Sequence, residues 1–203
     1  MREVAPGIWH WTAVHPRIKI AVSSYYLPAE HVLIDPIAPD EGLDWFAAHG
    51  PPGDILLTNR HHYRSSAEFE ARFGATVRCV REGMHEFTHG ERVEPFEFGD
   101  ELPGGIVAQR VGAICPDETA LYIPARKALA IADGAVRMGS DESLSFVPDF
   151  LMDEPEATKA GLRASYRRLA ELDFRHLLLA HGGPLVDNGR DALAAFAGSG
   201  EPS

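Results

Sequence analysis

The sequence predicts an α/β protein in which two mixed β-sheets pack face to face and helices cover their outer faces, a four-layer αββα sandwich. Candidate strands fall in two sets, one early and one late, with helices interspersed in both. Residues 53–80 read as strand, helix and strand, which is the cue for a parallel crossover. With 203 residues, 45% of them hydrophobic, the chain can bury one sizeable core. We therefore expect one domain over residues 1–198 and a disordered tail over 199–203.

The early set opens with three candidate strands that are rich in β-branched and aromatic residues: GIWHW, IKIAVSSYYL and HVLID. Pro and Asp turns separate them, which predicts an antiparallel opening. Apolar residues at helical spacing then predict a helix over 40–50 that ends in Gly50. The next elements are a buried strand (53–59), a helix capped by Ser65 or Ser66 that ends at Gly74, and a strand over 75–80.

The late set follows a loop-rich middle. Three successive strands are predicted over 105–111, 118–124 and 127–133, the last two joined by the tight turn PARK. A helix over 153–172 has acidic residues and a proline at its start and basic residues toward its end. A strand that ends on His181 and a closing helix over 188–198 complete the chain.

Charge and composition argue against several classes of partner. Nineteen Lys and Arg residues against thirty Asp and Glu residues give a formal net charge of -11, which repels nucleic-acid phosphates and anionic lipid. No apolar run approaches the roughly 20 residues that cross a bilayer. The two cysteines and an N-terminus without a signal-peptide core favour a cytoplasmic location. We expect a small-molecule ligand and neither a nucleic-acid nor a membrane partner.

Three polar residues follow the carboxyl ends of predicted strands. The stretch ILLTNRHHYRSS (55–66) runs from an apolar strand into two adjacent histidines, of which His61 is the first. Asp133 and His181 stand just beyond two later strands. Ligand sites gather at this edge of a sheet in α/β proteins, so these residues are candidates for one site.

The order of these elements resembles the metallo-β-lactamase superfamily over nearly the whole chain, and five segments carry the resemblance: HVLID, DILLTNRHH, ETALYIP, ALAIADG and LLLAHGGPL. In that family a strand ending in Thr runs into H-x-H-x-D-H. A third His lies in a Gly/Pro-rich turn, an Asp closes a later strand, and a last His follows. The resemblance implies the αββα fold and hydrolysis of an ester, thioester or amide by metal-bound water.

Carried over position by position, the resemblance implies a degenerate metal centre. After Thr58 only the second histidine of the motif stands, as His61, and the third His would fall near Ala113 or Ile114. Asp133 and His181 keep the last two positions, so three of seven ligand positions remain. Around them we expect a pocket lined by Asn59, Arg60, His62, Tyr63 and Arg64.

Three interpretations of this pocket stay open. We expect no ion and a lost or altered hydrolysis, with the Arg64 guanidinium paired to Asp133 and Tyr63 in the space of the second metal, since a buried carboxylate needs a positive partner. Alternatively, His61, Asp133 and His181 hold a single Zn, Fe or Mn ion as a 2-His-1-carboxylate site. The third interpretation is a non-catalytic scaffold or binder of small anions, which uses fixed guanidinium groups in place of metal.

Other residues receive plainer interpretations. His62 is expected to face outward, because neighbours in an extended segment alternate faces. Cys115 is expected to be a small packed side chain, and Asp117 and Glu118 to be solvated loop acids.

Two further segments leave alternatives open. The motif H-E-x-x-H at 85–89 matches metalloproteases, but it lies between two glycines that leave less than two turns of helix. The apolar segment SLSFVPDFLM (143–152) leaves room for a homodimer contact, which a loop packed on its own core would explain equally well.

Overall fold

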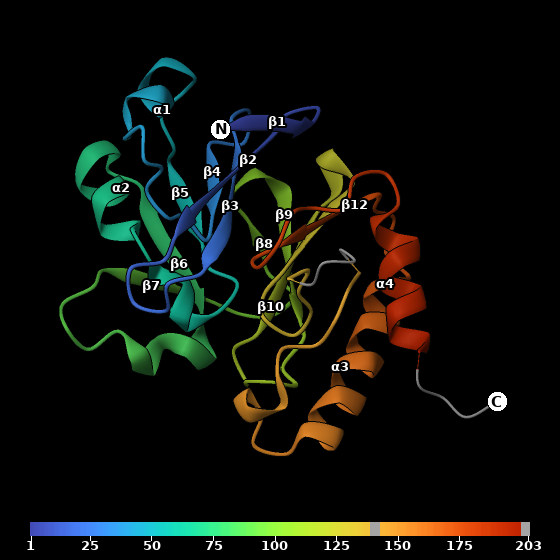
Figure 1. Cartoon of the computed structure of the whole chain (residues 1–203). Helices are drawn as coiled ribbons and strands as arrows, with labels where there is room; N and C mark the ends of the chain where they lie inside the picture. The colour runs from blue at the N-terminus through green and yellow to red at the C-terminus, as the bar shows by residue number, and fades with distance from the viewer. Residues whose placement is uncertain (139–142, 200–203) are drawn as a thin grey trace.

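The computed structural model describes residues 1–138 and 143–199. Two sheets stand face to face, with α1 and α2 beside the first and α3 and α4 beside the second (Figure 1). This arrangement confirms the predicted αββα sandwich. Of the predicted tail, residues 200–203 lie outside the described residues.

The first sheet has seven strands that pair in chain order: β1 (Arg2–Ala5), β2 (Ile8–Val14), β3 (Ala21–Leu27), β4 (Val32–Ile34), β5 (Asp54–Leu56), β6 (Thr76–Val80) and β7 (Val93–Phe96). β1 to β4 are antiparallel, and β4 to β7 are parallel. The antiparallel opening and the crossover are thus confirmed. The sequence did not predict β1 and β7, which lie at the two edges of the sheet and carry polar or proline residues that are typical of edge strands.

The second sheet has the order β12-β11-β10-β9-β8. Its strands are β8 (Glu101–Leu102), β9 (Ile106–Arg110), β10 (Thr119–Ile123), β11 (Ala128–Ile131) and β12 (His176–Leu179). All neighbours are antiparallel except β11 and β12, which are parallel, so this sheet is also mixed. Along the chain, the last strand of the first sheet and the first strand of the second are separated by residues 97–100.

The α-helices are α1 (Asp44–Ala48), α2 (Ser66–Phe73), α3 (Pro155–Leu169) and α4 (Gly189–Gly198). Five short 3-10 turns complete the described elements: η1 (Arg60–Tyr63), η2 (Arg81–Glu86), η3 (Pro103–Gly105), η4 (Pro124–Arg126) and η5 (Asp149–Leu151). α1 is shorter than predicted and has no side-chain cap at its N-terminus. Within the described ranges, no helix combines the length and the apolar character needed to cross a membrane.

The central core lies between the sheets and takes side chains from both, among them Leu27, Ile34, Leu121 and Leu178. Two further clusters lie under the helix pairs on the outer faces. The hydroxyl of Tyr25 on β3 joins the sheets, because it donates to the carbonyl of Leu179 and accepts from its N–H, both at 2.9 Å. These hydrogen bonds and the shared core hold the two sheets together.

Candidate functional site

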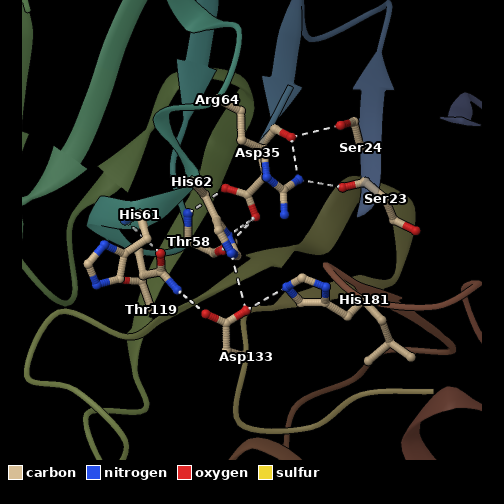
Figure 2. Close-up of polar contacts among 12 residues, drawn as sticks. Ser23, Ser24, Asp35, Thr58, His61, His62, Arg64, Thr119, Asp133 and His181 are labelled. Carbon is tan, nitrogen blue, oxygen red and sulfur yellow. Dashed lines mark hydrogen bonds and ion pairs between the residues drawn. The ribbon is translucent and has the colours of Figure 1, made fainter. Parts of the chain in front are cut away.

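The site lies where β5, β11 and β12 end. His62 belongs to η1, which follows β5, while Asp133 follows β11 and His181 follows β12. Figure 2 shows the three side chains pointing toward one another. One ligand atom of each lies within 4.8 Å of the other two. Two of the three residues were predicted together, and the third partner is His62 rather than His61.

Two side chains, Asn59 and Asp117, set the direction of η1. The Asn59 amide oxygen accepts from the His61 N–H at 2.9 Å, and its nitrogen donates to Asp133 Oδ2 at 2.9 Å. The buried Asp117 carboxylate accepts from the Arg60 N–H at 2.8 Å and pairs with the Arg60 guanidinium. In a 3-10 turn, successive side chains are about 120° apart. His61 therefore faces outward, and the next residue points into the site.

The expectation that His62 faces outward was wrong, because the segment is a 3-10 turn and not extended. His62 is only 4% exposed. Its Nδ1 lies 2.9 Å from Asp35 Oδ2, and its Nε2 lies 3.2 Å from Asp133 Oδ1. Burial and the charge of Arg64 lower its pKa, but the two carboxylates outweigh them and raise the pKa to about 9.

Asp35 is a site residue that the sequence analysis missed, although its segment HVLID was singled out for its strand. Its carboxylate accepts from the Thr58 N–H at 2.8 Å and from the Thr58 hydroxyl at 2.5 Å. Burial acts to raise its pKa, but the charges of His62 and Arg64 and these hydrogen bonds lower it. The available signal was its position at a strand end, on the same edge as the other candidates.

Asp133 is partly exposed to the pocket and accepts from three side chains. His62 and His181 approach Oδ1 at 3.2 and 3.0 Å, and Asn59 approaches Oδ2. Burial would raise its pKa, but the charge of His62 and the hydrogen bonds from both imidazoles hold the pKa well below its usual range.

The predicted pair between Arg64 and Asp133 is wrong. Arg64 Nη1 donates instead to the carbonyls of Ser23 at 2.7 Å and of Asp35 at 2.8 Å (Figure 2). The imidazole of His62 is the cationic group in contact with Asp133. A basic side chain does lie beside this carboxylate, but it is His62 and not Arg64.

The carbonyl groups on either side of His181 are held by Ser23 on β3. The Ser23 N–H donates to the Ala180 carbonyl at 2.9 Å, and the Ser23 hydroxyl donates to the Gly182 carbonyl at 2.7 Å. Because that hydroxyl donates its proton there, it accepts from His10 Nε2 at 2.9 Å. Strand β3 thus clamps both neighbours of His181, while the Nδ1 of His181 is buried and has no hydrogen-bond partner among the described residues.

A pocket of about 800 Å³ opens above this cluster. His61 is exposed and lines it, and burial and the charge of Arg60 lower its pKa. Tyr63 forms part of the wall and packs against Phe87. The predicted pocket residues Arg60, His62 and Arg64 also line it, whereas Asn59 is buried behind them.

The loop that would carry the third histidine of the resemblance contains two buried acids, so the expectation of solvated loop acids was wrong. Asp117 anchors Arg60, as described above. Glu118 Oε1 accepts from the Gly134 N–H at 2.8 Å, and burial raises the pKa of Glu118 to about 8. Cys115 is partly buried, and burial raises its thiol pKa, which agrees with a packed side chain.

The H-E-x-x-H segment does not form a zincin helix. The 3-10 turn η2 ends at Glu86, so His89 lies beyond it. Glu86 and His89 both line the pocket, but they belong to no metal-ligating group within the described residues.

The donor set at the centre of the site fits one metal ion. Two imidazoles and a carboxylate suit Zn, Fe or Mn. Metal-ligating histidines usually give their second ring nitrogen to a carboxylate, and Asp35 occupies that position beside His62 Nδ1. His62, Asp133 and His181 therefore form a donor set that could hold a single ion.

Solved structures with the same fold include a metallo-β-lactamase family protein from Thermus thermophilus, at 20% identity and a TM-score of 0.67 over 95% of this chain and 80% of that one. A metallo-β-lactamase from Pontibacter korlensis matches at 15% identity and a TM-score of 0.71, over 98% of both chains. The flavodiiron protein from Giardia intestinalis matches at 18% identity and a TM-score of 0.68, over 96% of this chain and 58% of its own.

No curated protein is detectably similar in sequence. At these identities the structural matches establish the fold alone. The sequence model of one family, described as the metallo-beta-lactamase superfamily, matches residues 2–199. This match covers nearly the whole chain and includes every residue of the site, and the chain therefore belongs to the metallo-β-lactamase superfamily.

Proposed function

We propose that the protein is a hydrolase of this superfamily that works with one metal ion, held by His62, Asp133 and His181. The observation that carries the proposal is the convergence of these three side chains at the base of an open pocket. The substrate class, an ester, thioester or amide, comes from the family resemblance.

A Zn, Fe or Mn ion at this position would supply a Lewis acid that polarises a carbonyl group and makes water nucleophilic at neutral pH. The residues of the chain orient this centre. Asp35 and Thr58 fix the ring of His62, Asn59 holds Asp133, and Ser23 holds the turn of His181. Such contacts keep ligands in place at little reorganisation cost when an ion binds.

A second candidate, a binder without metal, is favoured by the charge balance of the site. His62 lies between the carboxylates of Asp35 and Asp133, and Arg64 donates to the carbonyl of Asp35. Two cationic side chains thus compensate two carboxylates. In this candidate the hydrolytic chemistry is lost, and the pocket binds a small molecule or serves as a scaffold.

Metal analysis of protein purified without a His tag separates the two candidates. We expect about one equivalent of Zn, Fe or Mn in the wild type and its loss in His62→Gln, since three protein ligands are the usual minimum for a catalytic zinc. His61→Gln is the matched control, because it removes the neighbouring histidine of the same turn and should retain the metal.

The proposal predicts that the metal-loaded wild type hydrolyses a member of a panel of esters, thioesters and amides. Wild-type protein that stays free of metal after incubation with Zn, Fe and Mn would contradict it and favour the second candidate. Metal lost from His61→Gln but kept in His62→Gln would restore the ligand set predicted from the sequence.

A further inference from the structure

Arg64 has a buried donor that the protein leaves unused. Its Nη1 is bound to two carbonyls, but its Nη2 is buried without a hydrogen-bond partner among the described residues. Arg64 lines the pocket, and Figure 2 shows its guanidinium on the same side of the cluster as Ser23 and Asp35. A buried donor without an acceptor is destabilising, and an oxygen atom of a ligand would satisfy it.

The β2–β3 hairpin brings two more donors to this pocket. His15 and Arg17 both line it, in a turn closed by hydrogen bonds from the His15 N–H to the Ile20 carbonyl at 2.8 Å and from the Lys19 N–H to the His15 carbonyl at 2.9 Å. The Arg17 N–H donates to His15 Nδ1 at 3.2 Å, so the proton of the neutral ring is on Nε2. The hairpin thus presents an imidazole N–H and a guanidinium.

Basic side chains of the pocket act on the first of these donors, His15. Burial lowers the pKa of His15, and the charges of Arg64, Arg17, His62 and His181 lower it further. Arg17 forms no ion pair within the described part of the chain, whereas two acids of the pocket have nearby histidines of their own. Glu91 Oε1 lies 3.9 Å from His89 Nδ1. The charge of Glu86 acts to raise the pKa of His61.

We propose that a carboxylate or phosphate group binds between Arg64 Nη2, His15 and Arg17, beside the metal centre. The substrate of the proposed hydrolase then carries an anionic group close to the bond that is cleaved. Planar guanidinium groups and an N–H donor are well suited to such oxyanions. That this anion is part of a substrate rests on the proposed function, but binding of the anion does not require the metal.

Calorimetric titration of the full chain after removal of metal with EDTA tests this site. Malonate and inorganic phosphate serve as probes in parallel, at low ionic strength and pH 7. We expect saturable binding of at least one of them, weakened about tenfold in Arg17→Gln, which corresponds to the loss of one charge-assisted hydrogen bond. Lys19→Gln is the matched control, because it removes the same charge from the same hairpin at a residue outside the pocket lining.

Substitution of Arg64 itself would also remove its two hydrogen bonds to main-chain carbonyls, so His15→Gln is the second test variant, with binding expected to weaken as well. A wild type that binds neither anion would overturn the inference, as would Arg17→Gln with unchanged affinity. Equal weakening in Lys19→Gln would show only a general effect of surface charge and would also overturn it. If the protein binds metal but neither anion, the proposed function is supported and this inference is overturned. If it binds an anion but no metal, this inference is supported and the proposed function is contradicted.

Discussion

Glu118 retains its proton at a pH where a glutamate in water has lost it. Burial raises its pKa from the ordinary value of 4.5 to about 8, and the charge of Asp133 adds to the effect. Its Oε1 still accepts from the Gly134 N–H, next to Asp133, while its Oε2 has no partner among the described residues. The carboxyl group thus supports the Asp133 turn in its neutral form.

This raised pKa predicts that Glu118→Gln is the more stable protein above pH 5. In the unfolded chain the carboxyl ionises above about pH 4.5, but in the folded protein it stays neutral until about pH 8. The free energy of unfolding of the wild type should therefore fall between these two values as pH rises. The amide of Gln keeps the hydrogen bond and does not ionise, so the variant lacks this fall.

Urea unfolding of both proteins at pH 4.5, 6 and 8 measures the effect. The difference between them should grow to a few kcal/mol in favour of the variant. A difference that does not change with pH would contradict the raised pKa.

At the scale of single residues, the sequence predicted two of the three central side chains. Asp133 and His181 follow long apolar strands, whose ends are clear in the pattern. The choice between His61 and His62 depends on whether the residues after the strand are extended or helical. That is decided by Asp117, which lies 57 positions after Arg60 in the chain and holds it. A contact of this kind leaves no local signal.

At the scale of elements, α4 is fixed by close contact between its first residue and β12. The Gly189 N–H donates to the Arg175 carbonyl at 2.8 Å. A Cβ at Gly189 would lie 2.4 Å from the Leu177 nitrogen, which is backbone and cannot move aside, whereas a Cβ at Gly198 would meet nothing within 4 Å. The two ends of one helix therefore provide a matched pair of glycines.

We expect Gly189→Ala to lower the free energy of unfolding by about 2–4 kcal/mol, because α4 must shift away from the sheet. Gly198→Ala should raise it by up to about 1 kcal/mol, since alanine favours the helix. Thermal unfolding followed by circular dichroism compares the two variants with the wild type. Equal effects at the two positions would contradict the described packing of α4.

Helices and strands with a clear pattern of apolar residues were predictable from the sequence, and the strands at the edges of the first sheet were not. α3, β10 and β11 carry clear patterns of buried residues, and the structure has them close to the predicted bounds. β7 has the sequence VEPF, in which a proline and two exposed positions give no strand pattern. Its hydrogen bonds to β6 hold these residues as a strand, although their own sequence does not predict one.

At the scale of the whole molecule, Tyr25 is a polar link between the sheets inside an apolar core. Tyr25→Phe would leave the N–H and the carbonyl of Leu179 without this hydroxyl. We expect a loss of about 1–3 kcal/mol in the free energy of unfolding. Tyr122→Phe is the control, because its hydroxyl bonds the Asp173 carbonyl at the exposed surface and its loss should cost less than about 1 kcal/mol.

Urea unfolding at constant pH measures both variants. If the two substitutions cost the same, the hydroxyl of Tyr25 is not the link between the sheets that the structure describes.

The division of the chain between the two sheets has a consequence for its assembly. Residues 2–96 form one sheet and residues 101–179 the other, and His62 belongs to the first half while Asp133 and His181 belong to the second. Cleavage in the connecting turn at Gly99 would give two fragments, each with a complete sheet whose inner apolar face is uncovered. Each fragment would lack the other's cover, and mixing them should restore the fold by complementation. The site would form only in the reassembled pair, so metal binding at the site would measure how much of the pair has assembled.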